Sequence, residues 1–330
     1  MQQQGAQFDG KHFQNPVPTD VMRPGAMLTV LKEALKPHPG RTPDKHPGPF
    51  VVDKMALYKA DTNDVFITWL GHSTVLFTIE GKRFLTDPVW YQRVSPFTKF
   101  GPKRFFDVPV LVNDLPPLDF ILLSHDHYDH LDKGTILQLT KKNIPVITML
   151  GVGKRLRKWG VADNLIIELD WWQQKDLGDG FRITALPARH FSGRWINDRF
   201  TTLWGSFAIQ APHHSIYHGA DSGYYEGFIK IGDVFGSFDL TLLEIGAYNK
   251  HWADIHMGPE NAVKAHVDLH GKLLLPLHWG TFALAFHSWT EPIERLLNEA
   301  DKKKVPLLVP APGETRSLRD GAYLNEWWKK

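Results

Sequence analysis

The 330-residue chain contains no cysteine. Disulfides, thiolate metal ligands and cysteine nucleophiles are therefore excluded, and any metal site must be built from histidine and carboxylate side chains. The sequence also lacks an apolar run near the roughly 18 to 20 residues of a membrane span, and its first residues lack the basic-then-apolar order of a signal peptide. We therefore expect a cytoplasmic or peripheral membrane protein; a periplasmic location stays open if a signal or anchor was removed upstream.

The chain also has little net charge. Its 38 basic and 36 acidic side chains leave a formal charge of +2, so no strong field attracts it to a polyanion, and we expect no nucleic-acid partner. Histidine and tryptophan are abundant in contrast, with 17 and 12 residues. Many of the histidines stand beside aspartate, glycine and turn residues, which argues against solvated positions on an ordinary surface.

Residues 1–50 are polar and rich in proline, with too many prolines for a core helix or a central strand. We expect a Pro-rich N-terminal arm that wraps the rest of the protein, with one short helix near 26–35. Residues 51–330 are expected to form a single hydrolase domain, because candidate metal ligands recur from residue 125 to residue 278.

Short apolar strands separated by turns begin at Val65 and alternate later with helical segments. Two successive strand-rich halves, each with helices after its candidate ligands, predict an α/β fold in which two mixed β-sheets pack face to face with helices outside. Strands are expected at 65–70, 74–79, 83–86, 120–123, 145–149, 165–169, 181–186, 202–209, 215–218, 240–245 and 272–277. Helices are expected at 133–141, 154–159 and 259–269.

A dense cluster of possible metal ligands follows the apolar run 120–123. Within six residues it offers His125, His127, Asp129 and His130, a His-X-His-X-Asp-His pattern whose chance occurrence in this chain is roughly a few in a thousand. Two histidines at i and i+2 can bind one ion while the following Asp-His pair turns toward a neighbouring ion. Imidazole and carboxylate ligands suit Zn²⁺, with Fe and Mn²⁺ as alternatives. The pattern predicts a two-metal site.

Two sites of about four ligands each need side chains from elsewhere in the chain. His190, Asp221 and His278 each follow an apolar, strand-like segment and are flanked by small or turn residues. Alone, each is better explained as a buried histidine or a turn aspartate, but their shared placement favours metal ligands. The open alternative to an enzyme is a zinc-stabilised binding module. Structural zinc sites are usually closed by four ligands and often use cysteine, so this ligand set favours catalysis.

These motifs resemble those of the metallo-β-lactamase superfamily, and within it the N-acylphosphatidylethanolamine-hydrolysing phospholipase D family. The His-X-His-X-Asp-His pattern marks the superfamily only. The family-specific stretches are Gly-Pro-Lys-Arg-Phe at 101–105, Leu-Asp-Trp-Trp at 169–172 and His-Trp-Gly-Thr-Phe-Ala-Leu at 278–284. The resemblance runs from about Thr68 to Glu314 and implies the αββα sandwich of that superfamily.

The resemblance also implies a ligand set with two zinc ions per chain. One ion is expected on His125, His127 and His190. The other is expected on Asp129, His130 and His278. Asp221 would bridge the two ions.

Two further residues take their expected roles from the same resemblance. Asp87 would orient a ligand imidazole from behind, as such carboxylates do, although a turn aspartate before Pro88 explains it equally well. His256 matches a family histidine near the reacting phosphate, whereas the sequence alone shows only a histidine just before a helix. Asp129 and His256 are the expected catalytic residues.

The function that this implies is a zinc-dependent phosphodiesterase of phospholipase D type, which cleaves N-acylphosphatidylethanolamine-like phospholipids through a hydroxide held by both zincs and by Asp129. The substrate is then a phospholipid or another phosphodiester. An aromatic and basic segment, 90–106, is expected to form a rim in peripheral contact with the membrane, or else a loop that covers the core. A carboxylic ester or lactone hydrolase with the same zinc pair is the alternative enzyme. A homodimer is compatible with the sequence.

Overall fold

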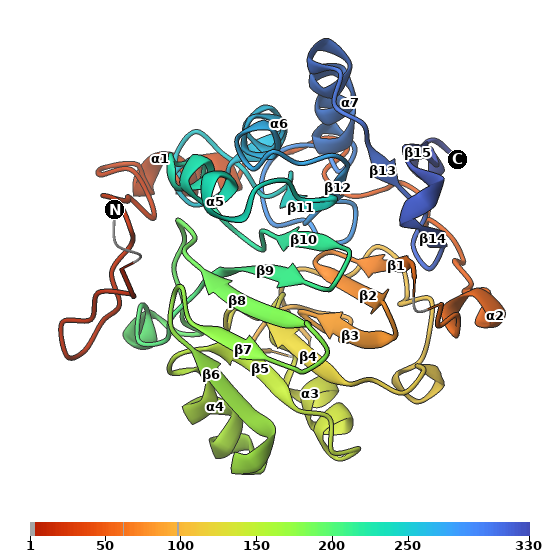
Figure 1. Cartoon of the computed structure of the whole chain (residues 1–330). Helices are drawn as coiled ribbons and strands as arrows, with labels where there is room; N and C mark the ends of the chain where they lie inside the picture. The colour runs from red at the N-terminus through yellow and green to blue at the C-terminus, as the bar shows by residue number, and fades with distance from the viewer. Residues whose placement is uncertain (1–3, 62, 98) are drawn as a thin grey trace.

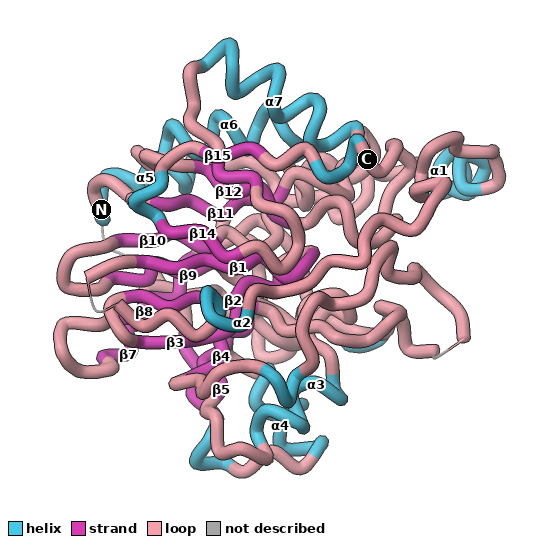
Figure 2. Tube along the Cα trace, turned by 90° about the vertical axis from the view of Figure 1, so that its right-hand side faces the viewer, coloured by secondary structure: helices cyan, strands magenta, loops and turns pink. Residues whose placement is uncertain are grey.

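Two β-sheets pack face to face at the centre of the molecule (Figure 1). The computed structural model describes residues 4–61, 63–97 and 99–330. In Figure 2 the strands lie between α5, α6 and α7 on one side and α3 and α4 on the other. This arrangement confirms the α/β sandwich of two mixed sheets that the sequence predicts.

The first sheet has seven strands in the order β14-β1-β2-β3-β4-β5-β6. Strands β1 to β3 form an antiparallel meander, and β3 to β6 run parallel. The parallel part contains continuous apolar runs such as Phe-Ile-Leu-Leu in β4, whose residues are all buried. The bounds are β1 Val65–Gly71, β2 Thr74–Ile79, β3 Lys82–Thr86, β4 Phe120–Leu123, β5 Val146–Met149, β6 Ile166–Leu169 and β14 Thr315–Ser317.

The second sheet has six strands in the order β12-β11-β10-β9-β8-β7. Strands β7 to β10 are antiparallel, and β10 to β12 are parallel. The bounds are β7 Gln174–Asp176, β8 Arg182–Leu186, β9 Ser206–Gln210, β10 Ser215–His218, β11 Leu240–Glu244 and β12 Leu274–Leu277. A separate parallel pair joins β13 Leu308–Val309 to β15 Tyr323–Leu324.

Helices cover the outer faces of both sheets. Helix α4 packs on β5 and β6, while α6 packs on β11 and is flanked by α5 and α7. The helices are α1 Met27–Ala34, α2 Lys54–Leu57, α3 Lys133–Thr140, α4 Val152–Trp159, α5 Gly227–Phe235, α6 Gly258–Asp268 and α7 Glu291–Lys303. Within the described residues, no helix has the length and apolar character that crossing a membrane requires.

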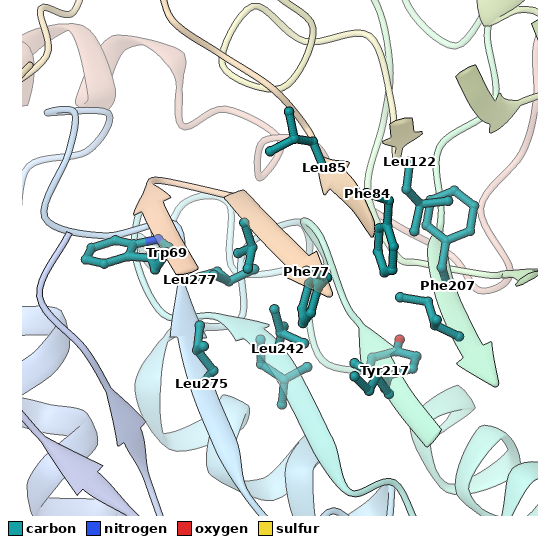
Figure 3. Close-up of a cluster of buried hydrophobic side chains, with 14 of the residues drawn as sticks. Trp69, Phe77, Phe84, Leu85, Leu122, Phe207, Tyr217, Leu242, Leu275 and Leu277 are labelled. Atoms are coloured by element: carbon teal, nitrogen blue, oxygen red, sulfur yellow. The ribbon is translucent and has the colours of Figure 1, made fainter. Parts of the chain in front are cut away.

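The core lies between the sheets, where large side chains from both inner faces meet (Figure 3). Phe77 and Phe84 of the first sheet face Tyr217 and Leu242 of the second, and all four are fully buried. Burial of this kind stabilises a fold by about 1.5–3 kcal/mol for each large apolar side chain. The packed core fixes the positions of the strand ends that carry the polar residues described next.

Candidate metal centre

The predicted site residues converge because they follow strands that run in the same direction. In the first sheet, β1, β3 and β4 end at one edge; in the second, β8, β10, β11 and β12 end at the same side of the sandwich. Functional side chains in α/β folds lie at this carboxyl edge. The residues that follow these strands are His72, Asp87, the 125–130 motif, His190, Asp221 and His278.

One group of four side chains combines His125, His127, His190 and Asp221, whose nearest nitrogen and oxygen atoms all lie within 4.8 Å of one another. His127 Nδ1 is 2.9 Å from His125 Nε2 and 3.2 Å from His190 Nε2. Neighbouring nitrogens of a tetrahedral zinc site are about 3.3 Å apart, given Zn–N bonds of about 2.0–2.1 Å. The spacing of these three imidazoles therefore fits a single cation.

A second group of four combines His72, Asp129, His130 and His278. Asp129 Oδ2 lies 3.0 Å from His72 Nε2 and 3.2 Å from His278 Nε2. Asp221 Oδ2 is 3.1 Å from His278 Nε2 and 3.2 Å from His130 Nε2. Asp221 thus reaches both groups, which is the position that the sequence predicts for a bridging carboxylate.

In His130 and His190, the ring nitrogen Nδ1 has a hydrogen-bonding partner outside the two groups of ligands. His130 Nδ1 is 2.8 Å from Asp87 Oδ2, and His190 Nδ1 is 2.9 Å from the carbonyl oxygen of Ile255. Asp87 also accepts hydrogen bonds from the backbone N–H and hydroxyl of Ser124. Such contacts fix the ring orientation and leave the other nitrogen free to bind a metal. Asp87 therefore makes the contact expected of a carboxylate that orients a ligand.

The charge states of the histidines and carboxylates in the metal centre favour the binding of cations. Burial lowers the pKa of His125 and of His190 well below the usual value, so both rings are neutral and can donate a lone pair. Burial opposes ionisation of Asp129 and Asp221, but His130 and the other neighbouring histidines together outweigh it and hold the pKa of both carboxyls well below their usual range. Two ionised, buried carboxylates need compensating positive charge, and divalent cations supply it when bound.

Opposing effects act on the imidazole of His278. Burial alone would lower the pKa of His278, but Asp221 and Asp129 raise it to about 10. Asp221 Oδ1 is buried and, among the described residues, has no hydrogen-bond partner. A buried acceptor without a donor is costly. The donor set, its spacing and this unpaired oxygen all fit a pair of metal ions.

His256 lies beside both groups. Its ring is 5.1 Å from that of His190 and 5.3 Å from that of His278, centroid to centroid. Its Nδ1 is 2.6 Å from Oε2 of Glu244, a fully buried carboxylate at the end of β11. Burial raises the pKa of Glu244, and His256 opposes that effect.

The sequence motifs did not identify His72 and Glu244 as site residues. His72 stands alone in the turn between β1 and β2, with a left-handed φ of 54°. Glu244 interrupts the apolar run Leu-Thr-Leu-Leu-Glu-Ile. A lone histidine at a positive-φ turn and a lone carboxylate in a buried strand are both weak signals. His72 follows β1 and Glu244 is the last residue of β11, and both strands end at the metal centre.

The proline-rich arm reaches the centre through Asn15. The Asn15 side chain accepts a hydrogen bond from the backbone N–H of His190 at 3.0 Å and donates one to its carbonyl oxygen at 2.7 Å. Nearby, Phe13 N–H donates to the Phe200 carbonyl, and Arg23 N–H donates to the His251 carbonyl. The arm therefore supports loops on the His190 side of the centre.

The segment 90–106 divides into two parts. Tyr91, Phe97 and Phe100 are exposed, whereas Arg104, Phe105 and Phe106 are buried. For the second part the structure matches the alternative of a loop that covers the core, because its aromatic rings pack into the core. Only the first part offers aromatic side chains to solvent.

A cavity of about 600 Å³ opens beside the histidine motif. Aromatic and basic side chains line it, among them Tyr91, Phe97, Tyr128, Trp159, Arg194 and Trp195. Tyr128 lies within the motif, and the Arg194 guanidinium stands 3.6 Å above its ring. Tyr128 therefore connects the cavity to the histidine motif, although the lining residues include none of the candidate metal ligands.

Known proteins share this sequence pattern and fold. Residues 82–279, well over half of the chain, match the family described as the Beta-lactamase superfamily domain. The chain belongs to the metallo-β-lactamase superfamily. This membership, together with similarity to a hydrolysing phospholipase D, identifies the chain as a metal-dependent hydrolase.

Two relatives are similar in sequence to the chain over most of its length. An uncharacterised protein of Mycobacterium tuberculosis is 44% identical over 315 residues, which is 93% of this chain and 84% of that protein. The N-acyl-phosphatidylethanolamine-hydrolyzing phospholipase D 1 of Caenorhabditis elegans is 37% identical over 253 residues, or 73% of this chain and 71% of the relative.

Igni18, a metallo hydrolase from Ignicoccus hospitalis, has a similar fold, with a TM-score of 0.59 at 22% identity. The similarity covers 77% of this chain and 98% of Igni18.

Proposed function

We propose that the protein is a phosphodiesterase of phospholipase D type that hydrolyses N-acylphosphatidylethanolamine-like phospholipids with the help of two zinc ions, Fe or Mn²⁺ being alternatives. The observation that carries this proposal is the pair of facing four-residue groups joined by Asp221, in a chain 37% identical to a phospholipase D of that name.

The proposed ligands divide as the two groups do. His125, His127 and His190 would hold one ion. His72, Asp129, His130 and His278 would hold the other, and we include His72 because it lies in the same group of four. Asp221, which reaches both groups, would be shared between them.

When bound, the two cations supply Lewis acidity and make hydroxide available at neutral pH by lowering the pKa of water. The protein's own residues orient the reactants. Among the carboxylates of the two groups, Asp129 is the more accessible, with 14% of its side chain exposed against 2% for Asp221. We assign Asp129 the task of accepting a hydrogen bond from the attacking water and aiming it at phosphorus.

His256 acts on the opposite side of the phosphoryl group. As the P–O bond to the N-acylethanolamine breaks, the departing oxygen takes a proton from His256, which yields phosphatidic acid and the free N-acylethanolamine. A positioned imidazole contributes about 10²- to 10⁴-fold in such a step. The neighbouring aromatic cavity supports a substrate with a long apolar substituent, which can lie along Phe97 and Tyr128.

The test compares lipid phosphodiesters with carbonyl esters on the zinc-loaded protein, with products identified by mass. N-acylphosphatidylethanolamine should be cleaved faster than short carboxylic esters or lactones. Release of phosphatidic acid identifies the phospholipase D bond. Equal or faster turnover of a lactone would overturn the proposal in favour of an ester or lactone hydrolase.

Two alanine variants separate catalysis from metal binding. His256→Ala should lower kcat by about 10²- to 10⁴-fold while elemental analysis still finds close to two metals per chain. His190→Ala should lose metal together with activity. Loss of metal from the His256 variant would show that His256 is a ligand instead.

A further inference from the structure

Glu244 is a carboxylate in a strand that is otherwise suited to the core. All five residues of β11 are buried, and Glu244 itself is completely inaccessible. Burying a carboxylate costs several kcal/mol unless hydrogen bonds compensate it. A glutamate at this position therefore needs a physical reason beyond packing.

Two backbone N–H groups and one imidazole nitrogen surround the carboxylate. Oε1 accepts from the backbone N–H of Ser222 at 3.0 Å and from that of Met257 at 3.2 Å. Oε2 lies 2.6 Å from Nδ1 of His256. Both oxygens are engaged, so the orientation of the carboxylate is fixed from two loops that border the metal centre.

The short contact determines which nitrogen of His256 carries the proton. An ionised carboxylate can only accept, so Nδ1 must donate. In the neutral ring this leaves Nε2, on the far side from Glu244, as the nitrogen with a lone pair. The ring itself lies between His190 and His278, so its rotation is restricted.

We propose that Glu244 is a positioning residue, which holds the Nδ1–H of His256 and so directs Nε2, the nitrogen from which the departing oxygen takes its proton, toward the reacting group. This inference rests on the role given to His256 in the proposed function. It adds a residue that acts through the imidazole. Glu244 and His256 also form a third possible ligand group with Asp221 and His278, so metal content is measured in every variant.

Glu244→Gln provides a sharp test because it changes hydrogen-bonding chemistry with little change in shape. A glutamine has only one acceptor oxygen, and the Ser222 and Met257 N–H groups both require it. Its NH₂ group then faces His256 Nδ1, which must accept, so the proton moves to Nε2. The ring that carries a proton on both nitrogens, and that can give one from Nε2, then has no carboxylate at Nδ1 to stabilise it, so kcat should fall by about 10²- to 10⁴-fold, with KM changed only a few-fold.

A double-mutant cycle distinguishes this role from a structural one. If Glu244 acts through His256, Glu244→Gln should have little further effect when His256 is already alanine. Glu244→Asp retains the acceptor and should recover part of the lost kcat. Glu260→Gln, at an exposed residue paired with Arg295, is the matched control and should leave kcat unchanged.

A nitrogen-15 NMR measurement on the zinc-loaded protein tests the tautomer without any substrate. Signals that disappear in His256→Asn identify the ring. They should report Nδ1–H in the wild type and Nε2–H in Glu244→Gln. An Nε2–H tautomer in the wild type, or an unchanged tautomer in the variant, overturns the inference.

Failure here is distinguishable from failure of the proposed function. If the protein cleaves another ester but not the phospholipid, the proposed substrate is wrong. The double-mutant cycle of Glu244 and His256 is then run with that ester, and it still decides the role of Glu244. An equal loss of kcat in both backgrounds, or loss of metal from Glu244→Gln, refutes positioning through His256. If no ester is cleaved, the tautomer measurement decides alone.

Discussion

Replacing Asn15 by alanine should weaken one half of the metal centre and spare the other. The side chain makes two hydrogen bonds with the main chain of His190, a buried residue. Each contributes about 0.5–1.5 kcal/mol net. Together they contribute about 1–3 kcal/mol, which is an upper bound because Asn15 is only half-buried and water can replace part of the loss.

That energy corresponds to a change in metal affinity of about 10- to 100-fold, since about 1.4 kcal/mol equals a factor of ten. The same range is typical when a support behind a metal ligand is removed. The weakened ion should be the one held by His125, His127 and His190. The ion beside Asp129 and His278 should bind as before.

Competition for zinc with a chromophoric chelator measures the two affinities separately. Gln14→Ala, at an exposed neighbouring side chain, is the matched control and should change neither. Asn15→Asp retains the acceptor for the His190 N–H but loses the donor, so its effect should be intermediate. Equal weakening of both ions, or a lower Tm with unchanged affinities, would refute the reasoning.

Two other changes test the backbone and the charge network around the centre. An ideal Cβ at Gly246 would lie 2.0 Å from the carbonyl oxygen of His278, so Gly246→Ala should displace that ligand and reduce the zinc content from two toward one by elemental analysis. The Arg155 guanidinium forms ion pairs with the buried Asp126 at 2.8 Å and with Asp198 at 2.9 Å. Arg155→Ala removes the cation that is paired with the buried Asp126 carboxylate. The free energy of unfolding, measured in urea, should fall by about 3–5 kcal/mol. An unchanged zinc content in Gly246→Ala would contradict the first argument, and an unchanged free energy of unfolding in Arg155→Ala would contradict the second.

The elements that the sequence predicts best are those whose signal is local. The run 120–123 and the motif after it lie in adjacent residues, so strand, turn and ligands can be read together. The prediction for 202–209 is less accurate, because β9 begins only at Ser206. Residues 203 and 204 are buried, but they bond to Leu150 and Ala188 outside the sheet. An apolar pattern indicates that a segment is buried, but it does not specify which groups the segment forms hydrogen bonds with.

The site shows the same limit. His125 to His130 could be predicted because several ligands coincide in one short motif. His72 could not, since a single histidine in a turn resembles any other until β1 is known to run parallel to β3 and β4 in the same sheet. The contact of Asn15 with His190 spans 175 positions, and no sequence pattern links the two residues.

That long-range contact also bears on the order in which the protein folds. Asn15 is synthesised early, yet its partner follows 175 residues later, which at about 5–20 residues per second is roughly 10 to 35 s of translation. Contacts so distant along the chain must close large loops, which slows folding. The metal centre cannot be complete on the ribosome until residue 278 has emerged, so loading of both metals must follow synthesis of most of the chain.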